Sequence, residues 1–218
     1  MSSVVSINDM RRVSLKELKE LAYDAKYGLW EKARRYDRDV KLYLHWTAGA
    51  YHQFWDSYHV QIDSDGSIYI QDGVGFDTVL NGIWMRNSGS VGITLLGCFD
   101  ATTSQGLGTN PPTAAQIESL SMVVAVLSNA HDLTIDKQRV LTHGEAADNE
   151  DGYWGSYGED ELYGPNTTCT RWDLEYLGTA DSPVFDPTNT EGKRGGDIIR
   201  GKAAWYSSQY PDGVENHM

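Results

Sequence analysis

Residues 91–96 read VGITLL, and this nearly continuous apolar run decides the class of fold. Such a strand has no polar face for solvent, so we expect it at the centre of a sheet that is covered on both sides. Residues 41–46 (KLYLHW) predict a second strand, in which Leu44 and His45 lie on opposite faces. Helical patterns are interleaved with the strands. The sequence therefore predicts an α/β fold, a single domain with a central mixed sheet flanked by helices.

Two long helices are predicted from capping boxes at their starts. Ser14 is followed by Glu17 and Thr113 by Gln116, and apolar residues at helical spacing continue from each pair. The other expected elements are a hairpin of residues 58–62 and 67–71, a strand at 138–142, a short helix at 171–177 and a last helix at 197–206. Residues 144–170 are acidic and aperiodic, which is typical of a functional or disordered loop.

Composition excludes several classes of partner. The net charge of −13 repels nucleic-acid phosphates and gives no attraction to anionic membranes. We find no apolar window of 18 residues, so we expect no membrane insertion. The two cysteines, Cys98 and Cys169, are too few for a disulfide framework, and two free thiols are favoured over one bridge. The N-terminus does not resemble a signal peptide.

Two histidines lie where an α/β domain collects its reactive side chains. His45 and His143 are placed at the ends of predicted strands. Taken alone, each histidine is more often structural than a ligand. Together they could supply two imidazoles to a catalytic zinc, which needs three protein ligands and an open fourth position. The acidic and cysteine residues that could supply the third ligand all follow His143.

Five segments, in order, resemble one family. They are LHWTAG at 44–49, YHVQIDSDGSIY at 58–69, RNSGSVGITLLG at 86–97, LTHGE at 141–145 and RWDLEYLG at 171–178. No single segment is specific, but the series is similar to the zinc amidases of the phage amidase-lysozyme and peptidoglycan-recognition-protein superfamily. The resemblance spans about residues 41–178. It implies zinc-dependent hydrolysis of the amide bond between N-acetylmuramic acid and L-alanine in peptidoglycan.

The resemblance also implies the ligands of one zinc ion in a surface cleft. His45 and His143 match the two histidines of the family, whose third ligand is a cysteine or an aspartate two residues after a basic residue. Arg171 followed by Asp173 fits this arrangement, and Cys169 is the competitor. Zinc would activate a water and polarise the scissile carbonyl. Arg171 would then stabilise the oxyanion electrostatically, because an arginine does not give up its proton at neutral pH.

Further roles follow from the same resemblance. Tyr58 matches a tyrosine that touches the catalytic water or the substrate carbonyl, which leaves His59 on the opposite face with a structural role. Glu145 is expected to act as a base or to orient a ligand if the chain is extended there, and a solvated carboxylate is an equal alternative. Arg86 and Asn87 match a segment that lines the substrate groove. Trp46 is expected to stack on the substrate, with core packing as the alternative.

The expected organisation is a flexible tail at 1–13, an amidase catalytic domain at 14–178 and a C-terminal extension at 179–218 that packs on it or trails from it. We expect a monomer. Without a signal peptide, an endolysin made in the cytoplasm and released to the cell wall by a holin-type protein is the favoured setting, and a cytoplasmic recycling enzyme is the alternative. A non-catalytic peptidoglycan-recognition module and a zinc peptidase acting on the stem peptide are the competing functions.

Overall fold

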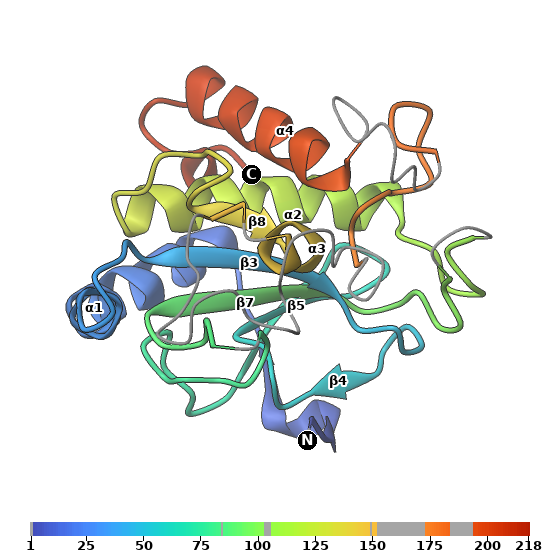
Figure 1. The fold of residues 1–218 in the computed structure, drawn as a ribbon, viewed down its shortest axis with the longest axis horizontal. Coiled ribbons are helices and arrows are strands. Elements are labelled where there is room, and N and C mark those ends of the chain that lie inside the picture. Colours follow the sequence, from blue (N-terminus) through green and yellow to red (C-terminus); the bar gives the residue numbers. More distant parts are fainter. Residues whose placement is uncertain (1, 84, 103–105, 149, 152–172, 184–193) are drawn as a thin grey trace.

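A six-stranded mixed sheet forms the centre of the molecule in the computed structural model, which describes residues 2–83, 85–102, 106–148, 150–151, 173–183 and 194–218. The strand order is β2-β6-β5-β7-β3-β8 (Figure 1). The strands are β2 (Met10–Arg12), β3 (Lys41–Trp46), β5 (Val60–Ile62), β6 (Ile68–Gln71), β7 (Ser90–Leu95) and β8 (Val140–Thr142). Strands β5, β7, β3 and β8 run parallel, whereas β2 and β6 are antiparallel to their neighbours. The predicted α/β class and the central place of the VGITLL strand are confirmed.

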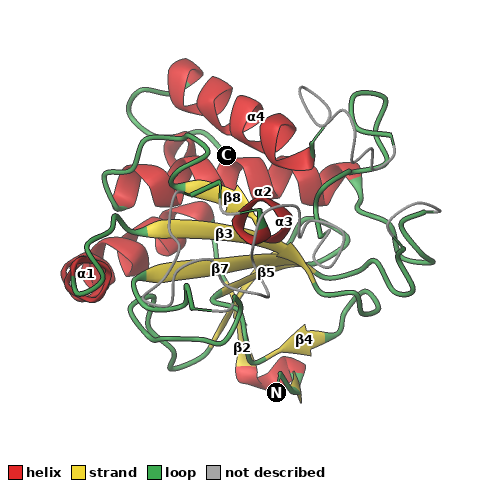
Figure 2. Cartoon of the chain, in the orientation of Figure 1, coloured by secondary structure: helices red, strands yellow, loops and turns green. Residues whose placement is uncertain are grey.

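Helices cover this sheet, as Figure 2 shows. They are α1 (Leu15–Arg34), α2 (Ala114–Ala130), the short α3 (His143–Ala147) and α4 (Gly195–Gln209), with 3-10 turns at Ile7–Asp9 and Val214–Asn216. The capping boxes predicted at Ser14 and Thr113 are both present. The short helix predicted at 171–177 is wrong over its described part, because residues 173–177 form a turn and a bend followed by irregular chain.

The alternation along β3 gives the sheet two chemically different faces. Leu42, Leu44 and Trp46 belong to the main core, which also contains the buried residues of α1, α2 and α4. Tyr43 packs on the opposite face in a smaller cluster with Ile83, Leu141, Ala146 and Ala147. His45 shares the face of Tyr43, because side chains alternate along a strand. It therefore points away from the layer of long helices.

The N-terminal residues differ from the expected tail. Met10–Arg12 pair with β6 as the edge strand β2, and Val4–Val5 (β1) pair with Phe54–Trp55 (β4) in a separate two-stranded sheet. Backbone hydrogen bonds hold this segment against the fold, and Met10 is buried. Strand β2 is hard to predict from the sequence, because it is short, carries two exposed arginines and pairs with the distant strand β6.

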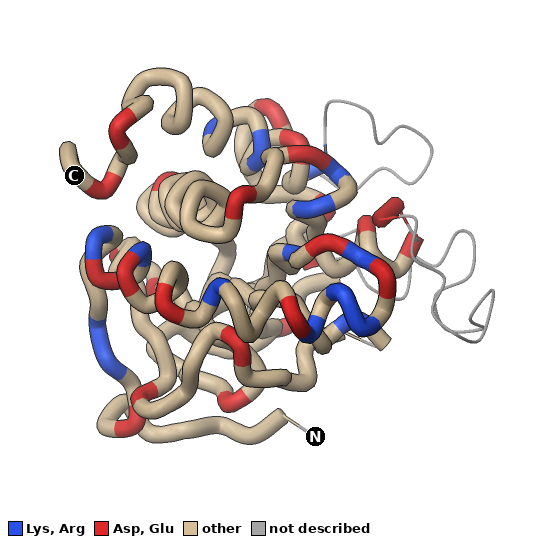
Figure 3. The backbone as a smooth tube through the Cα atoms, turned by 90° about the vertical axis from the view of Figure 1, so that its left-hand side faces the viewer, with Lys and Arg blue, Asp and Glu red and all other residues tan. Residues whose placement is uncertain are grey.

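The C-terminal residues pack on the domain rather than trail from it. Helix α4 lies beside α2 in Figure 1, and Ile199, Ala203, Tyr206 and Val214 join the main core. In Figure 3, acidic and basic positions are interspersed over the described chain. Among the described helices, we find none that combines the length and the apolar character needed to cross a bilayer.

Candidate metal centre

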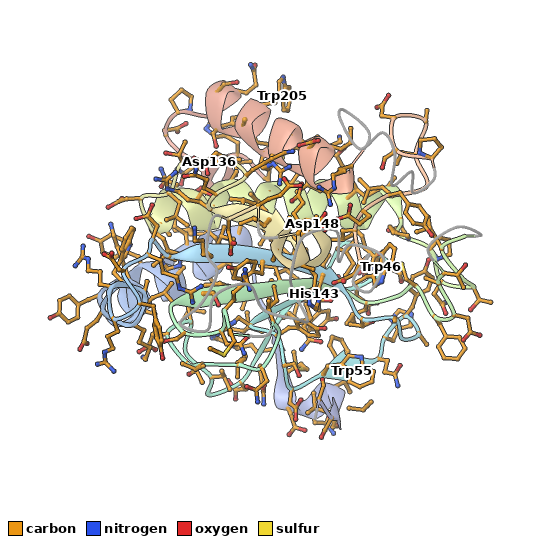
Figure 4. The ribbon with its side chains drawn as sticks, viewed as in Figure 1. Trp46, Trp55, Asp136, His143, Asp148 and Trp205 are labelled. Atoms are coloured by element: carbon orange, nitrogen blue, oxygen red, sulfur yellow. The ribbon has the colours of Figure 1, made fainter. Side chains whose placement is uncertain are left out.

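Two neighbouring parallel strands bring the first two candidate ligands together. His45 is the penultimate residue of β3, and His143 directly follows β8. The register pairs Leu44 with Thr142, so the two histidines occupy matching positions on adjacent strands. Figure 4 shows His143 and Trp46 at the same end of the sheet. This is the carboxyl end of the parallel strands, where open α/β sheets commonly bind ligands.

Asp173 completes a compact group with both histidines. One carboxylate oxygen lies 2.9 Å from Nδ1 of His45, and the other lies 3.3 Å from Nδ1 of His143. The three potential ligand atoms all lie within 4.8 Å of one another. Ligands of a tetrahedral zinc at 2.0–2.1 Å from the ion are about 3.3 Å apart, so the two distances between carboxylate and imidazole are close to those around a shared zinc ion. The remaining coordination position would be open to water.

The pKa shifts of His45 and Asp173 favour the protonation states that bind a metal ion. Burial lowers the pKa of His45, although Asp173 acts in the opposite direction. Burial also opposes ionisation of Asp173, but the two histidines more than offset it, and the pKa of this carboxyl lies well below its ordinary value. A neutral imidazole and an ionised carboxylate are the forms that bind zinc. The side chains of His143 and Asp173 are 12% and 11% exposed, so the site is reached from their side.

The backbone next to Asp173 is strained. Leu174 is fully buried and has a φ of 62°, a left-handed conformation that leucine seldom adopts. Such residues persist only where the surrounding structure holds them, and they concentrate at functional sites. The conformation of Leu174 sets the direction in which the chain leaves Asp173.

Comparison with known proteins identifies the family of this chain. A sequence model described as N-acetylmuramoyl-L-alanine amidase matches residues 31–155, which is more than half of the chain. The chain belongs to this amidase family. The match includes His45 and His143 but ends before Asp173, so the position of the aspartate rests on the structure. A search of curated proteins gave no match.

Several solved structures are similar to parts of the amidase. The endolysin amidase LysCS from Clostridium intestinale URNW is 18% identical over 48% of this chain and 68% of that one, with a TM-score of 0.37. The Ph2119 endolysin from the Thermus scotoductus MAT2119 bacteriophage is 18% identical over 49% and 72%, with a TM-score of 0.38. PGRP-Hd from Alvinella pompejana is 19% identical over 44% and 68%, with a TM-score of 0.31. TM-scores below 0.5 add no argument to the sequence match.

Tyr58 lies beside the candidate metal centre. Its ring centroid is 5.1 Å from that of His45. Burial, together with the charge of Asp173, raises the pKa of the phenol well above its ordinary value, so it stays protonated and can donate a hydrogen bond. His59 does not lie on the opposite side, contrary to the prediction, because it lines the same small cavity as His45. Its role is structural: one ring nitrogen lies 2.8 Å from the carbonyl oxygen of Thr78, and the other accepts from the backbone of Gly92.

Arg86 does not line a groove, contrary to the prediction. Only 2% of it is exposed, and its guanidinium donates to the carboxylate of Asp151 at 2.9 Å. The hydroxyl of Tyr43 donates to the same carboxylate oxygen at 2.9 Å. Arg86 therefore anchors Asp151, which follows α3, against Tyr43 of β3. The roles of Tyr43 and Asp151 were not predicted from the sequence, although Tyr43 shares the face of His45.

Asn87 and Trp46 are also engaged within the protein. The side-chain oxygen of Asn87 accepts from the backbone N–H groups of Gly82 and Ile83, at 3.0 and 2.7 Å. Asn87 thereby fixes the loop of Gly82, which lies close to the ring of His45. Trp46 is 5% exposed and packs edge-to-face on Tyr176, with ring centroids 5.9 Å apart. The alternative of core packing is the correct one for Trp46.

Glu145 is not placed to act as a base. The chain enters α3 at His143 instead of remaining extended, so residues two apart point in different directions. Glu145 is fully buried and paired with Arg200 at 2.7 Å. The remaining predicted residues, Arg171 and the competing ligand Cys169, lie outside the described residues.

Proposed function

We propose that this chain is a zinc-dependent amidase that hydrolyses the bond between the lactyl group of N-acetylmuramic acid and L-alanine. The convergence of His45, His143 and Asp173 at the carboxyl ends of β3 and β8 carries this proposal. Membership of the amidase family supports the choice of bond. Two imidazoles and one carboxylate are a ligand set of catalytic zinc sites.

The residues of the chain would divide the work as follows. The three ligands would hold one zinc ion, which lowers the pKa of its water and polarises the carbonyl to be cleaved. Tyr58 keeps its proton and would donate a hydrogen bond to the substrate carbonyl as negative charge develops there. Arg171 is proposed to add positive charge at the same place. The near-complete burial of His45 keeps water away from that side of the site.

The proposal is tested by metal analysis together with product analysis. We expect about one zinc per chain and, from purified peptidoglycan, release of L-alanine amino groups without new reducing sugars. Chelation should abolish release, and added zinc should restore it. Asp173→Asn should lose both zinc and activity. His217→Ala is the matched control, because His217 is an exposed histidine that pairs with Asp212 in the C-terminal turn.

Other results would overturn the proposal. Binding of peptidoglycan without amine release would indicate a recognition module, and cut stem peptides alone would indicate a zinc peptidase.

Cys169→Ser decides between the two candidate third ligands: it should leave zinc bound if Asp173 is the ligand. The endolysin setting, the release route and the monomeric state stay predictions.

A further inference from the structure

Arg194, at the N-cap of α4, and Arg200, within this helix, form ion pairs with residues close to the candidate metal centre. Both lie outside the residues that match the amidase family. Arg200 donates to both carboxylate oxygens of Glu145, each at 2.7 Å, and to the carbonyl oxygen of Val140 at 2.9 Å. Glu145 is 0% exposed and Arg200 is 6% exposed. A bidentate pair of this kind fixes direction as well as distance.

Glu145 connects Arg200 to the start of α3 through hydrogen bonds with Thr142. Its carboxylate accepts from the backbone N–H of Thr142 at 2.9 Å, and its own N–H donates to the hydroxyl of Thr142 at 3.1 Å. These two bonds form the capping box of α3, and His143 is the first residue of that helix. Arg200 therefore holds the carboxylate that fixes where His143 leaves β8.

Arg194 acts in the same way on the segment that carries Asp173. Its Nε donates to the carboxylate of Glu175 at 2.6 Å, and the N–H of Gly195 donates to the carbonyl oxygen of Glu175 at 3.0 Å. Glu175 is 2% exposed and lies two residues after Asp173. Arg194 also binds Asp148, just after α3, at 2.8 Å.

Thr142 joins the hydrogen bonds of Arg200 and those of Arg194 into one network. Its hydroxyl donates to Glu175 at 2.9 Å while it accepts from the N–H of Glu145. A continuous set of buried hydrogen bonds thus runs from Arg200 through Glu145, Thr142 and Glu175 to Arg194. The residue before His143 and the residue two after Asp173 are tied to each other, and both are tied to α4.

The two glycines that begin α4 show how closely it approaches these segments. A Cβ at Gly195 would lie 2.1 Å from the carbonyl oxygen of Leu174, and a Cβ at Gly196 would lie 2.6 Å from the carboxylate of Glu145. Only a residue without a side chain permits this packing. An apolar contact would hold α4 to the domain as well as a buried ion pair does. What the ion pairs add is a fixed direction for each carboxylate.

We propose that Arg194 and Arg200 are positioning residues of the metal centre. They hold His143 and Asp173 at the separation that the ion requires before it binds, so α4 presets the site. The inference rests on the proposed zinc centre. Loss of partners that orient the ligands of a metal typically lowers its affinity about 10–100-fold. We expect a loss in this range when Arg200 loses its two-pronged contact with Glu145, or when Arg194 loses the planar set of bonds that joins Glu175 to Asp148.

The test measures metal binding on the full-length chain, by zinc competition with a chromogenic chelator and by the visible absorption of the cobalt-substituted protein. Arg200→Lys and Arg194→Lys keep the charge but lose the geometry. They should lower zinc affinity at least about tenfold and change the cobalt spectrum. The double variant Glu145→Gln with Arg200→Gln avoids an unpaired buried charge, so it serves if a single variant fails to fold.

The matched control is Lys202→Met, which breaks the ion pair between α4 and Glu118 of α2. It should leave zinc affinity and the cobalt spectrum unchanged. Folded arginine variants that bind zinc as wild type does would overturn the inference while leaving the zinc centre intact. An equal loss of affinity in Lys202→Met would also overturn it, because looseness of α4 would then explain the effect. A wild-type chain that binds no zinc would overturn the zinc centre and this inference together.

Discussion

Replacing Gly195 by alanine tests the close approach of α4 to the segment that carries Asp173. The added Cβ would lie 2.1 Å from the carbonyl oxygen of Leu174 and 3.1 Å from its carbonyl carbon. A comfortable separation is about 3.5 Å, so the two backbones would have to move apart by more than about 1 Å. The hydrogen bond from Gly195 to Glu175 and the ion pair of Arg194 resist that movement.

The expected cost lies at the upper end of the range for overpacking, about 3 kcal/mol, because the clash is with backbone and cannot be relieved by a rotamer change. In a chain of this size, that loss lowers Tm by roughly 6–12 °C. Gly201→Ala is the matched control, since its Cβ meets nothing within 4 Å. It should raise stability by about 1 kcal/mol through helix propensity.

Thermal unfolding followed by circular dichroism, with metal chelated, measures both variants. The same samples, titrated with zinc, show whether the displaced segment has also weakened the metal centre. The reasoning is refuted if Gly195→Ala unfolds at or above the temperature of wild type, or if Gly201→Ala is destabilised as much as Gly195→Ala.

Three further substitutions probe the site and the core. Tyr58→Phe should lower kcat about 100-fold, as loss of an oxyanion donor does, while zinc affinity is unchanged; equal activity would remove Tyr58 from the reaction. Arg86→Met should cost about 3–5 kcal/mol in urea unfolding, because it breaks the buried ion pair with Asp151; in the folded fraction KM should not change, and a raised KM would restore the groove role. His131 is fully buried, and neither ring nitrogen has a hydrogen-bond partner among the described residues. Burial, aided by Lys26, lowers the pKa of His131 from 6.5 to about 4. The contribution of this residue to the free energy of unfolding is therefore fully present above pH 6.5 and is lost as the pH falls towards 4. His131→Leu should remove about 3 kcal/mol of that loss, and an unchanged acid limb in urea unfolding would contradict this.

Local patterns in the sequence were sufficient to predict much of the fold and part of the site. The alternation in residues 41–46 places His45 on the face opposite Leu44, and the pattern of residues 138–142 places His143 at the end of a strand. Both conclusions depend only on the local pattern of a strand, whereas the parallel pairing that brings the two histidines together was found in the structure. Asp173 was different, because only the family resemblance indicated it. No periodic pattern links Asp173, which lies in a turn, to His45, which is 128 positions away.

Glu145 shows a signal that was present but not used. Thr142 and Glu145 have the same spacing as the capping boxes that correctly predicted α1 and α2. The same rule at Thr142 would have predicted a helix from His143 and a structural carboxylate at Glu145. Arg86 offered no comparable signal, since its partner Asp151 is 65 residues away. A buried arginine is unusual, and its burial follows only from the tertiary contact.

The contacts of α4 bear on where the catalytic unit ends. A boundary at residue 178 would remove Ile199 and Ala203 from the main core, and it would leave the carboxylates of Glu145 and Glu175 buried without their arginines. Each uncompensated buried charge costs several kcal/mol, which is a large share of the stability of a typical domain. The same contacts fix the segments of His143 and Asp173. We therefore propose that residues 194–218 belong to the folding unit of the amidase. In the proposed arrangement the sheet would supply the two histidines of the zinc centre, while the C-terminal helix would set the distance between His143 and Asp173.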